Sequence, residues 1–172
     1  MNLPETLALI AKYLGLCLGL CYAYQILYLF LPLFRKKNIP AAKKFHRYAI
    51  LIAARNEEAV LPHLLDSIRQ QDYPVEYIQV FVVADNCTDN TAQVAAEGGA
   101  VVFTRFSTKQ VGKGYALNHL LHQIDISYGW DSFDAFLVFD ADNILCPDYI
   151  TQMNSVCCAG YDVSFTQKNR LP

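Results

Sequence analysis

The 22 residues from Tyr13 to Phe34 carry no formal charge, and most of them are apolar. A helix needs about 20 apolar residues to cross the hydrocarbon core of a bilayer. A secretory signal peptide would have a shorter apolar region and a small-residue cleavage site, and no such site precedes Arg35. A buried core helix is the other alternative, although the stretch is long for one. We therefore predict one transmembrane helix within residues 1–34.

A basic segment follows this stretch. Residues 35–47 contain six Lys or Arg side chains and no acidic one, whereas the N-terminal flank has Lys12 opposed by Glu5. The positive-inside rule places the more basic flank in the cytoplasm. We therefore expect a single pass through the cell membrane, a juxtamembrane linker over 35–47 and a cytoplasmic domain after it. The linker is either a plain stop-transfer flank or a surface for anionic lipid headgroups.

The rest of the chain has the composition of a globular domain. Of the 14 basic and 16 acidic residues, only Lys12 and Glu5 precede position 35. The net charge of −2 at pH 7 gives no reason to expect a nucleic acid partner. The composition also excludes a disordered chain and a coiled coil.

Apolar runs of strand length alternate with helical patterns from Tyr48 onward. The predicted strands are 48–54, 77–84, 100–104, 134–139 and 161–166. Apolar residues recur at helical spacing over 60–68 and 116–124, a short helix is expected before Gly98, and Pro147 opens another. Asn56 is the predicted N-cap of the first helix, and Thr88 or Asp89 that of the second. This alternation predicts an α/β domain over 48–172, with a doubly wound, mostly parallel sheet.

Polar residues follow three of the predicted strands. The segments are 55–58, 85–89 and 140–142. Parallel strands end at one edge of the sheet, and ligands of such sheets bind outside these carboxyl ends. The sequence therefore predicts a ligand site at this edge.

Asp140 and Asp142 give the sharpest chemical signal. Two carboxylates at this spacing can leave a strand end on the same side. Together they could hold Mg²⁺ or Mn²⁺, which accept a few carboxylates together with water and phosphate oxygens. A metal there would offset the charge of a diphosphate leaving group. A solvated turn is the alternative interpretation of the pair.

Other polar residues have two interpretations each. Asp85 could accept a hydrogen bond from a base N–H or a ribose hydroxyl, or form an Asx-turn or helix cap. Lys113, flanked by glycines, could meet a phosphate near a helix N-terminus, or be a surface lysine. His119, His122 and Asp125 are three apart, and we interpret them as solvated helix residues rather than metal ligands. We assign Arg105 no role from the sequence.

Taken together and in this order, the motifs resemble the family-2 inverting glycosyltransferases. The matching segments are 52–58, 85–91, 113–118 and 140–142. The resemblance implies a GT-A fold with a Rossmann-like nucleotide-binding half, and attack of an acceptor hydroxyl on a nucleotide-diphosphate sugar with inversion. Ala53 stands where the family often has Pro, and Asn86 where it often has a second Asp.

The resemblance also implies roles for individual residues. Asp140 and Asp142 would bind Mg²⁺ or Mn²⁺. The implied donor, a UDP-sugar by the family's commonest usage, would contact six residues: Ala53, Arg55, Glu57, Asp85, Lys113 and Asp140. The acceptor would be a glycan or a lipid, as in polysaccharide biosynthesis.

No acidic motif for a catalytic base follows Asp142. Family domains continue well past the metal motif, whereas 30 residues remain here. We therefore expect the base beyond Pro172, and interpret the chain as the donor-binding half of a longer protein.

Two alternative functions stay open. Residues 140–145 nearly fit the nucleophile motif of haloacid-dehalogenase-type phosphatases. That motif normally lies near the start of its domain, whereas here it lies near the end of the chain. A non-catalytic, membrane-tethered module that holds a nucleotide or a partner is the other alternative.

Overall fold

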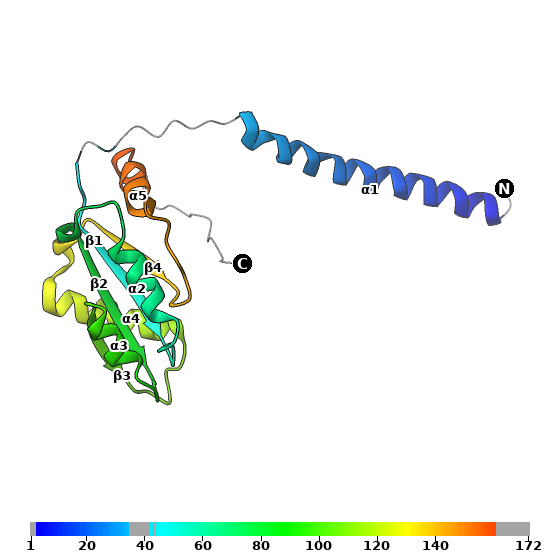
Figure 1. The fold of residues 1–172 in the computed structure, drawn as a ribbon. Coiled ribbons are helices and arrows are strands. Elements are labelled where there is room, and N and C mark those ends of the chain that lie inside the picture. The colour runs from blue at the N-terminus through cyan, green and yellow to red at the C-terminus, as the bar shows by residue number, and fades with distance from the viewer. Residues whose placement is uncertain (1–2, 35–41, 43, 161–172) are drawn as a thin grey trace. The chain divides into compact units, whose positions relative to one another are not determined.

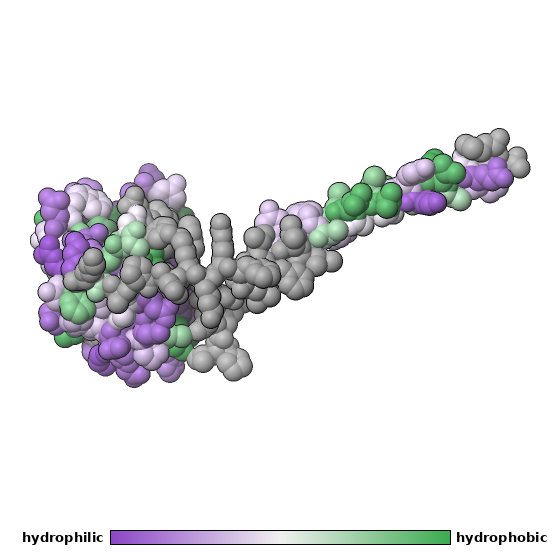
Figure 2. All heavy atoms as spheres, turned by 90° about the horizontal axis from the view of Figure 1, so that it is seen from above, coloured by the Kyte–Doolittle hydropathy of each residue, from purple (hydrophilic) through white to green (hydrophobic). Residues whose placement is uncertain are grey.

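The computed structural model describes residues 3–34, 42 and 44–160, and the chain divides into two units, Met1–Ile39 and Pro40–Pro172. The first unit contains helix α1 (Leu3–Phe34), coloured blue in Figure 1. Its part Leu3–Gln25 is long and apolar enough to cross a membrane by length and composition. Figure 2 shows stretches of apolar residues along this helix, in green, with paler and purple residues between them. The helix begins well before Tyr13, with Glu5 in its first turn, where the helix dipole favours an acidic side chain.

The second unit consists of alternating strands and helices. In chain order its elements are β1 (Tyr48–Ala54), α2 (Leu61–Arg69), η1 (Val75–Tyr77), β2 (Ile78–Asp85), α3 (Thr91–Glu97), β3 (Val101–Arg105), α4 (Lys113–Tyr128), η2 (Trp130–Ser132), β4 (Ala135–Phe139) and α5 (Tyr149–Cys158). The first four predicted strands are confirmed to within one residue at each end. The fifth, over 161–166, lies outside the described residues.

The four strands form one parallel sheet in the order β3-β2-β1-β4. Helix α4 packs on one face, and α2, α3 and α5 contribute to the core on the other (Figure 1). Alternate residues of β1 enter the two cores: Ile50 and Ile52 face α2, whereas Ala49 and Leu51 face α4. The predicted doubly wound α/β fold is therefore confirmed. Because both faces are covered, the strands are nearly continuous apolar runs.

The segment just before β1 is fastened to the domain by a buried polar cluster. Asn154 on α5 is 1% exposed, and its Nδ2 donates to the Lys44 carbonyl at 2.8 Å. The Tyr48 hydroxyl donates to Asn154 Oδ1, and the Tyr73 hydroxyl donates to the His46 carbonyl. Burial raises the pKa of Tyr73 to about 12 and raises that of Tyr48 as well. Both phenols therefore keep the protons that these hydrogen bonds require.

Helix α2 begins later than predicted. Its N-cap is Val60, Pro62 lies in its first turn, and Glu57 stays in the preceding loop. The prediction of Asn56 as the N-cap is therefore wrong. Asn56 has a φ of 55°, a left-handed conformation that Asn tolerates better than most residues, and it turns the chain as it leaves β1.

The start of α3 also differs from the prediction by a residue or two. Its N-cap is Asn90, where Thr88 or Asp89 was predicted. Asp89 nevertheless accepts the backbone N–H of Thr91 at 3.0 Å and the Thr91 hydroxyl at 2.5 Å. These hydrogen bonds, led by the one from the hydroxyl, hold the pKa of the Asp89 carboxyl below its usual range.

Candidate functional site

The pairing of the strands brings predicted site residues onto one face of the sheet. Asp85 and Arg105 are direct partners in the β2–β3 register, and Ala53 pairs with Val83. Side chains alternate between faces along a strand. Since Val83 packs toward α4, Asp85 and Arg105 leave the strand ends on that same face.

A pocket of about 100 Å³ lies at this carboxyl edge. Its lining comes from the ends of β1 and β2 and from the start of α4: Ala53, Ala54, Arg55, Asp85, Gly112, Lys113 and Ala116. Four of the six predicted donor-binding residues are therefore brought together. Parallel sheets of this order bind ligands at such an edge, near the point where the strand order reverses, which here is between β1 and β4.

Lys113 connects this pocket to the end of β4. It is the first residue of α4, and Gly112 before it has a φ of 127°, a conformation that favours glycine. Its ammonium donates a hydrogen bond to Asp140 Oδ1, and the two side chains are about half exposed. Asp142, the second predicted metal ligand, is exposed two residues further on. Lys113 therefore connects the pocket lining to Asp140, the first of the two acidic residues after β4.

A buried ion pair supports Asp85. Arg105 Nη1 lies 2.5 Å from Asp85 Oδ1, and both side chains are less than 10% exposed. Arg105 Nη2 also donates to the Gln110 carbonyl at 2.7 Å, which ties the β3–α4 loop to the same group. Sequence analysis missed Arg105. A charged residue ending an apolar strand was the available signal, because a buried charge requires a partner.

Two asparagines connect the loops that border the pocket. Asn56 Oδ1 accepts the backbone N–H of Thr88 at 2.8 Å, and Asn86 Oδ1 accepts that of Ser107 at 2.8 Å. Asn86 also has a left-handed φ, of 54°. The loops after β1, β2 and β3 are therefore linked through side chains that follow β1 and β2.

Two buried polar side-chain atoms in the described part of the chain have no hydrogen-bond partner: Asn86 Nδ2 and Asn143 Oδ1. Buried polar atoms are nearly always paired with protein or water. Both of these follow strands that end at the candidate site. One unpaired donor therefore follows β2, and one unpaired acceptor lies in the loop after β4.

Glu57 does not line the pocket. The structure shows a role for its backbone, because its N–H donates to the Thr91 hydroxyl at 2.8 Å. Its neighbour Glu58 accepts the N–H of Asn90 at 2.8 Å. Glu57 therefore lies where the β1–α2 loop meets the start of α3.

The acidic pair has the right chemistry for a hard divalent cation. Mg²⁺ and Mn²⁺ are bound by one or two carboxylates and completed by water and phosphate oxygens. The Asp140 carboxylate contacts the ammonium group of Lys113 through one oxygen. Within residues 3–34, 42 and 44–160, no three His, Cys, Asp or Glu side chains form a metal cluster, and His119, His122 and Asp125 are no exception.

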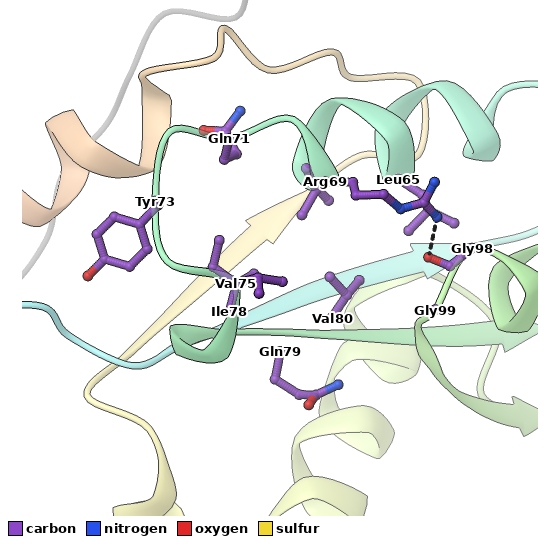
Figure 3. A pocket seen from close by; sticks show the side chains of 11 residues that line it. Leu65, Arg69, Gln71, Tyr73, Val75, Ile78, Gln79, Val80, Gly98 and Gly99 are labelled. Carbon is purple, nitrogen blue, oxygen red and sulfur yellow. Dashed lines mark hydrogen bonds between the residues drawn. The ribbon is translucent and has the colours of Figure 1, made fainter.

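A larger pocket of about 210 Å³ lies near the start of β2 (Figure 3). Ile78, Val80 and Leu65 contribute apolar lining, and Arg69 donates to the Gly98 carbonyl at 3.2 Å beside it. None of the predicted site residues lines this pocket. It has no acidic side chain in its lining, whereas Asp85 and Lys113 line the smaller pocket.

Comparison with known proteins identifies the family of the chain. A model of the family described as "Glycosyltransferase like family 2" matches residues 46–170. The 4,4'-diaponeurosporenoate glycosyltransferase of Staphylococcus aureus is 45% identical over 74 residues, which cover 43% of this chain and 19% of that protein. The chain thus spans about a fifth of the length of the curated relatives that it matches.

Solved structures share the fold. A mannosyltransferase from Pyrobaculum calidifontis, in complex with GDP-Man and Mn²⁺, has a TM-score of 0.59 and 23% identity over 91% of this chain and 43% of its own. TarS 1–349 from S. aureus, in complex with UDP, has a TM-score of 0.50 and 22% identity over 62% of this chain and 30% of its own.

Proposed function

Because the chain belongs to glycosyltransferase-like family 2, we propose that its second unit binds the nucleotide-diphosphate sugar of a membrane-anchored, inverting glycosyltransferase. One observation carries the proposal. The pocket at the carboxyl edge places Asp85 and Lys113 in one lining, and Lys113 contacts Asp140. Asp85 at the end of β2 suits a nucleoside, Lys113 at the start of α4 suits a diphosphate, and Asp140 after β4 suits a metal ion.

The nucleoside half of the donor is proposed to bind beside Asp85. Its carboxylate would accept a hydrogen bond from a base N–H or a ribose hydroxyl, and Arg105 holds it in place. Ala53 and Arg55 lie in the same lining and would border the base. Glu57 is also proposed to contact the donor. Its position in the adjoining β1–α2 loop supports this proposal. A UDP-sugar is the proposed donor, on the family's usual preference.

The diphosphate is proposed to lie between Lys113 and the end of β4. Asp140 and Asp142 would hold Mg²⁺ or Mn²⁺, and Asp140 is also counted among the donor-binding residues. When bound, the metal supplies positive charge opposite the leaving diphosphate. Lys113 would add a second positive charge at the N-terminus of α4, where backbone N–H groups also favour anions.

The remaining parts of the protein are proposed from sequence. α1 would cross the cell membrane, residues 35–47 would form the basic linker, and the domain from 48 onward would be cytoplasmic.

The catalytic base would lie beyond Pro172. The acceptor would be a glycan or a lipid. The family match favours this function over the phosphatase alternative.

Binding of UDP to the full chain in detergent, measured by calorimetry, tests the proposal. We expect binding in the presence of Mn²⁺ and at least about tenfold weaker binding in EDTA or in Asp142→Asn, because the metal neutralises the diphosphate. Asp125→Asn, which removes an exposed acid near the end of α4, should bind UDP like the wild type. UDP binding that is absent, or unaffected by both EDTA and Asp142→Asn, would contradict the proposal.

A further inference from the structure

The contact between Lys113 and Asp140 places a protein cation at one of the two proposed metal ligands. Lys113 begins α4, and Asp140 directly follows β4. The Lys113 ammonium donates to an oxygen that a divalent cation would also use. The two side chains of this contact are about half exposed. Gly112 and Gly114 flank Lys113, so neither sequence neighbour has a side chain that crowds it.

We infer that the Lys113 ammonium competes with the metal for Asp140. The diphosphate of the donor removes this competition, because it binds Lys113 in place of Asp140. This inference rests on the proposed function. It adds that binding of the metal and binding of the donor nucleotide are coupled. In the absence of donor, a metal must displace the ammonium from Asp140. When the diphosphate is present, Lys113 has a phosphate to bind instead, and Asp140 becomes available to the metal.

The consequence is cooperative binding of metal and nucleotide. If the diphosphate releases Asp140 for the metal, the metal must increase the affinity for the diphosphate by the same factor. Binding of the metal alone would remain weak. The magnitude is modest, because exposed ion pairs contribute at most about 1 kcal/mol, which corresponds to a change in affinity of up to about fivefold.

Lys113→Met tests the inference, because methionine keeps an unbranched side chain of nearly the same length and removes the charge. Mn²⁺ affinity is measured from the electron paramagnetic resonance signal of free Mn²⁺, on the full chain in detergent, with and without UDP. Without UDP, Lys113→Met should bind Mn²⁺ more tightly than the wild type, by up to about fivefold. The increase in Mn²⁺ affinity that UDP produces should be smaller in this variant.

Two control variants separate the specific contact from a general effect of charge. Lys109→Met removes a charge from an exposed lysine in the preceding loop, outside the pocket lining, and should leave Mn²⁺ affinity unchanged. Lys113→Arg keeps the positive charge and should not tighten Mn²⁺ binding. Circular dichroism melting of each variant confirms that the fold is retained.

The outcomes distinguish this inference from the proposed function. Wild-type chain that binds Mn²⁺ and UDP, with Mn²⁺ affinity in Lys113→Met equal to or weaker than the wild type, overturns the inference alone. The inference is also overturned if Lys109→Met increases the Mn²⁺ affinity as much as Lys113→Met does, because the effect would then be one of overall charge. Chain that binds no Mn²⁺ even with UDP overturns both.

Discussion

Replacing Arg105 by leucine is expected to lower the free energy of unfolding by about 3–5 kcal/mol, because the Asp85 carboxylate would stay buried without its partner. The pair joins the last residues of β2 and β3, and both side chains are less than 10% exposed. Urea unfolding of the second unit can be followed by the fluorescence of Trp130, the one tryptophan of the chain. The variant should also lose UDP affinity, since Asp85 lines the proposed nucleoside site.

An exposed ion pair provides the matched control. Arg69 and Asp66 lie 3.0 Å apart on α2, and both side chains are more than half exposed. Because Arg69 also donates to the Gly98 carbonyl, Asp66→Leu is the cleaner change, and it should cost at most about 1 kcal/mol. The double variant Asp85→Leu/Arg105→Leu should be more stable than the sum of the single changes predicts, because no uncompensated charge remains. A cost of 1 kcal/mol or less for Arg105→Leu would show that the pair is not buried as described.

Replacing Asn56 by alanine is expected to cost about 2 kcal/mol of stability. Alanine at a φ of 55° places its Cβ too close to the following carbonyl, whereas Asn tolerates this conformation better. The variant also loses the hydrogen bond from the Thr88 N–H, which contributes about 0.5–1.5 kcal/mol. The same urea unfolding experiment measures this change.

Asn56→Gly separates the two contributions. Glycine adopts a positive φ readily but has no side chain to accept the Thr88 N–H, so we expect a cost of about 1 kcal/mol. The difference between the alanine and glycine variants then gives the conformational part. Equal costs for the two variants would rule out backbone strain as the reason for Asn at this position.

The strands and the site edge could be predicted because both depend on local sequence. The apolar runs of β1 to β4 end where polar residues begin, and strand alternation with helices allows few arrangements of the sheet. The resemblance to the family adds Ala53, Arg55, Asp85 and Lys113 as members of one site, and these four residues line one pocket. The helix start at Leu61 was harder, because Glu57 and Glu58 resemble a first helical turn but belong to the loop.

Contacts between distant segments could not be predicted in the same way. Arg105 meets Asp85 only because β2 and β3 pair in one particular register, which the residues of either strand alone do not determine. The contact between Lys113 and Asp140 likewise depends on how α4 packs on the sheet. Asn56 was misassigned because a capping side chain and a left-handed turn favour the same residue type.

The position of Mn²⁺ in the UDP complex tests the central claim most directly. Bound Mn²⁺ broadens the amide signals of nearby residues in the nuclear magnetic resonance spectrum of the full chain in micelles. With UDP present, broadening should centre on residues 140–143 and extend to Gly112 and Arg55, at the carboxyl edge of the sheet. Broadening centred instead on Ile78 and Gly98, beside the pocket of Figure 3, or spread evenly over the domain, would contradict a donor site at this edge.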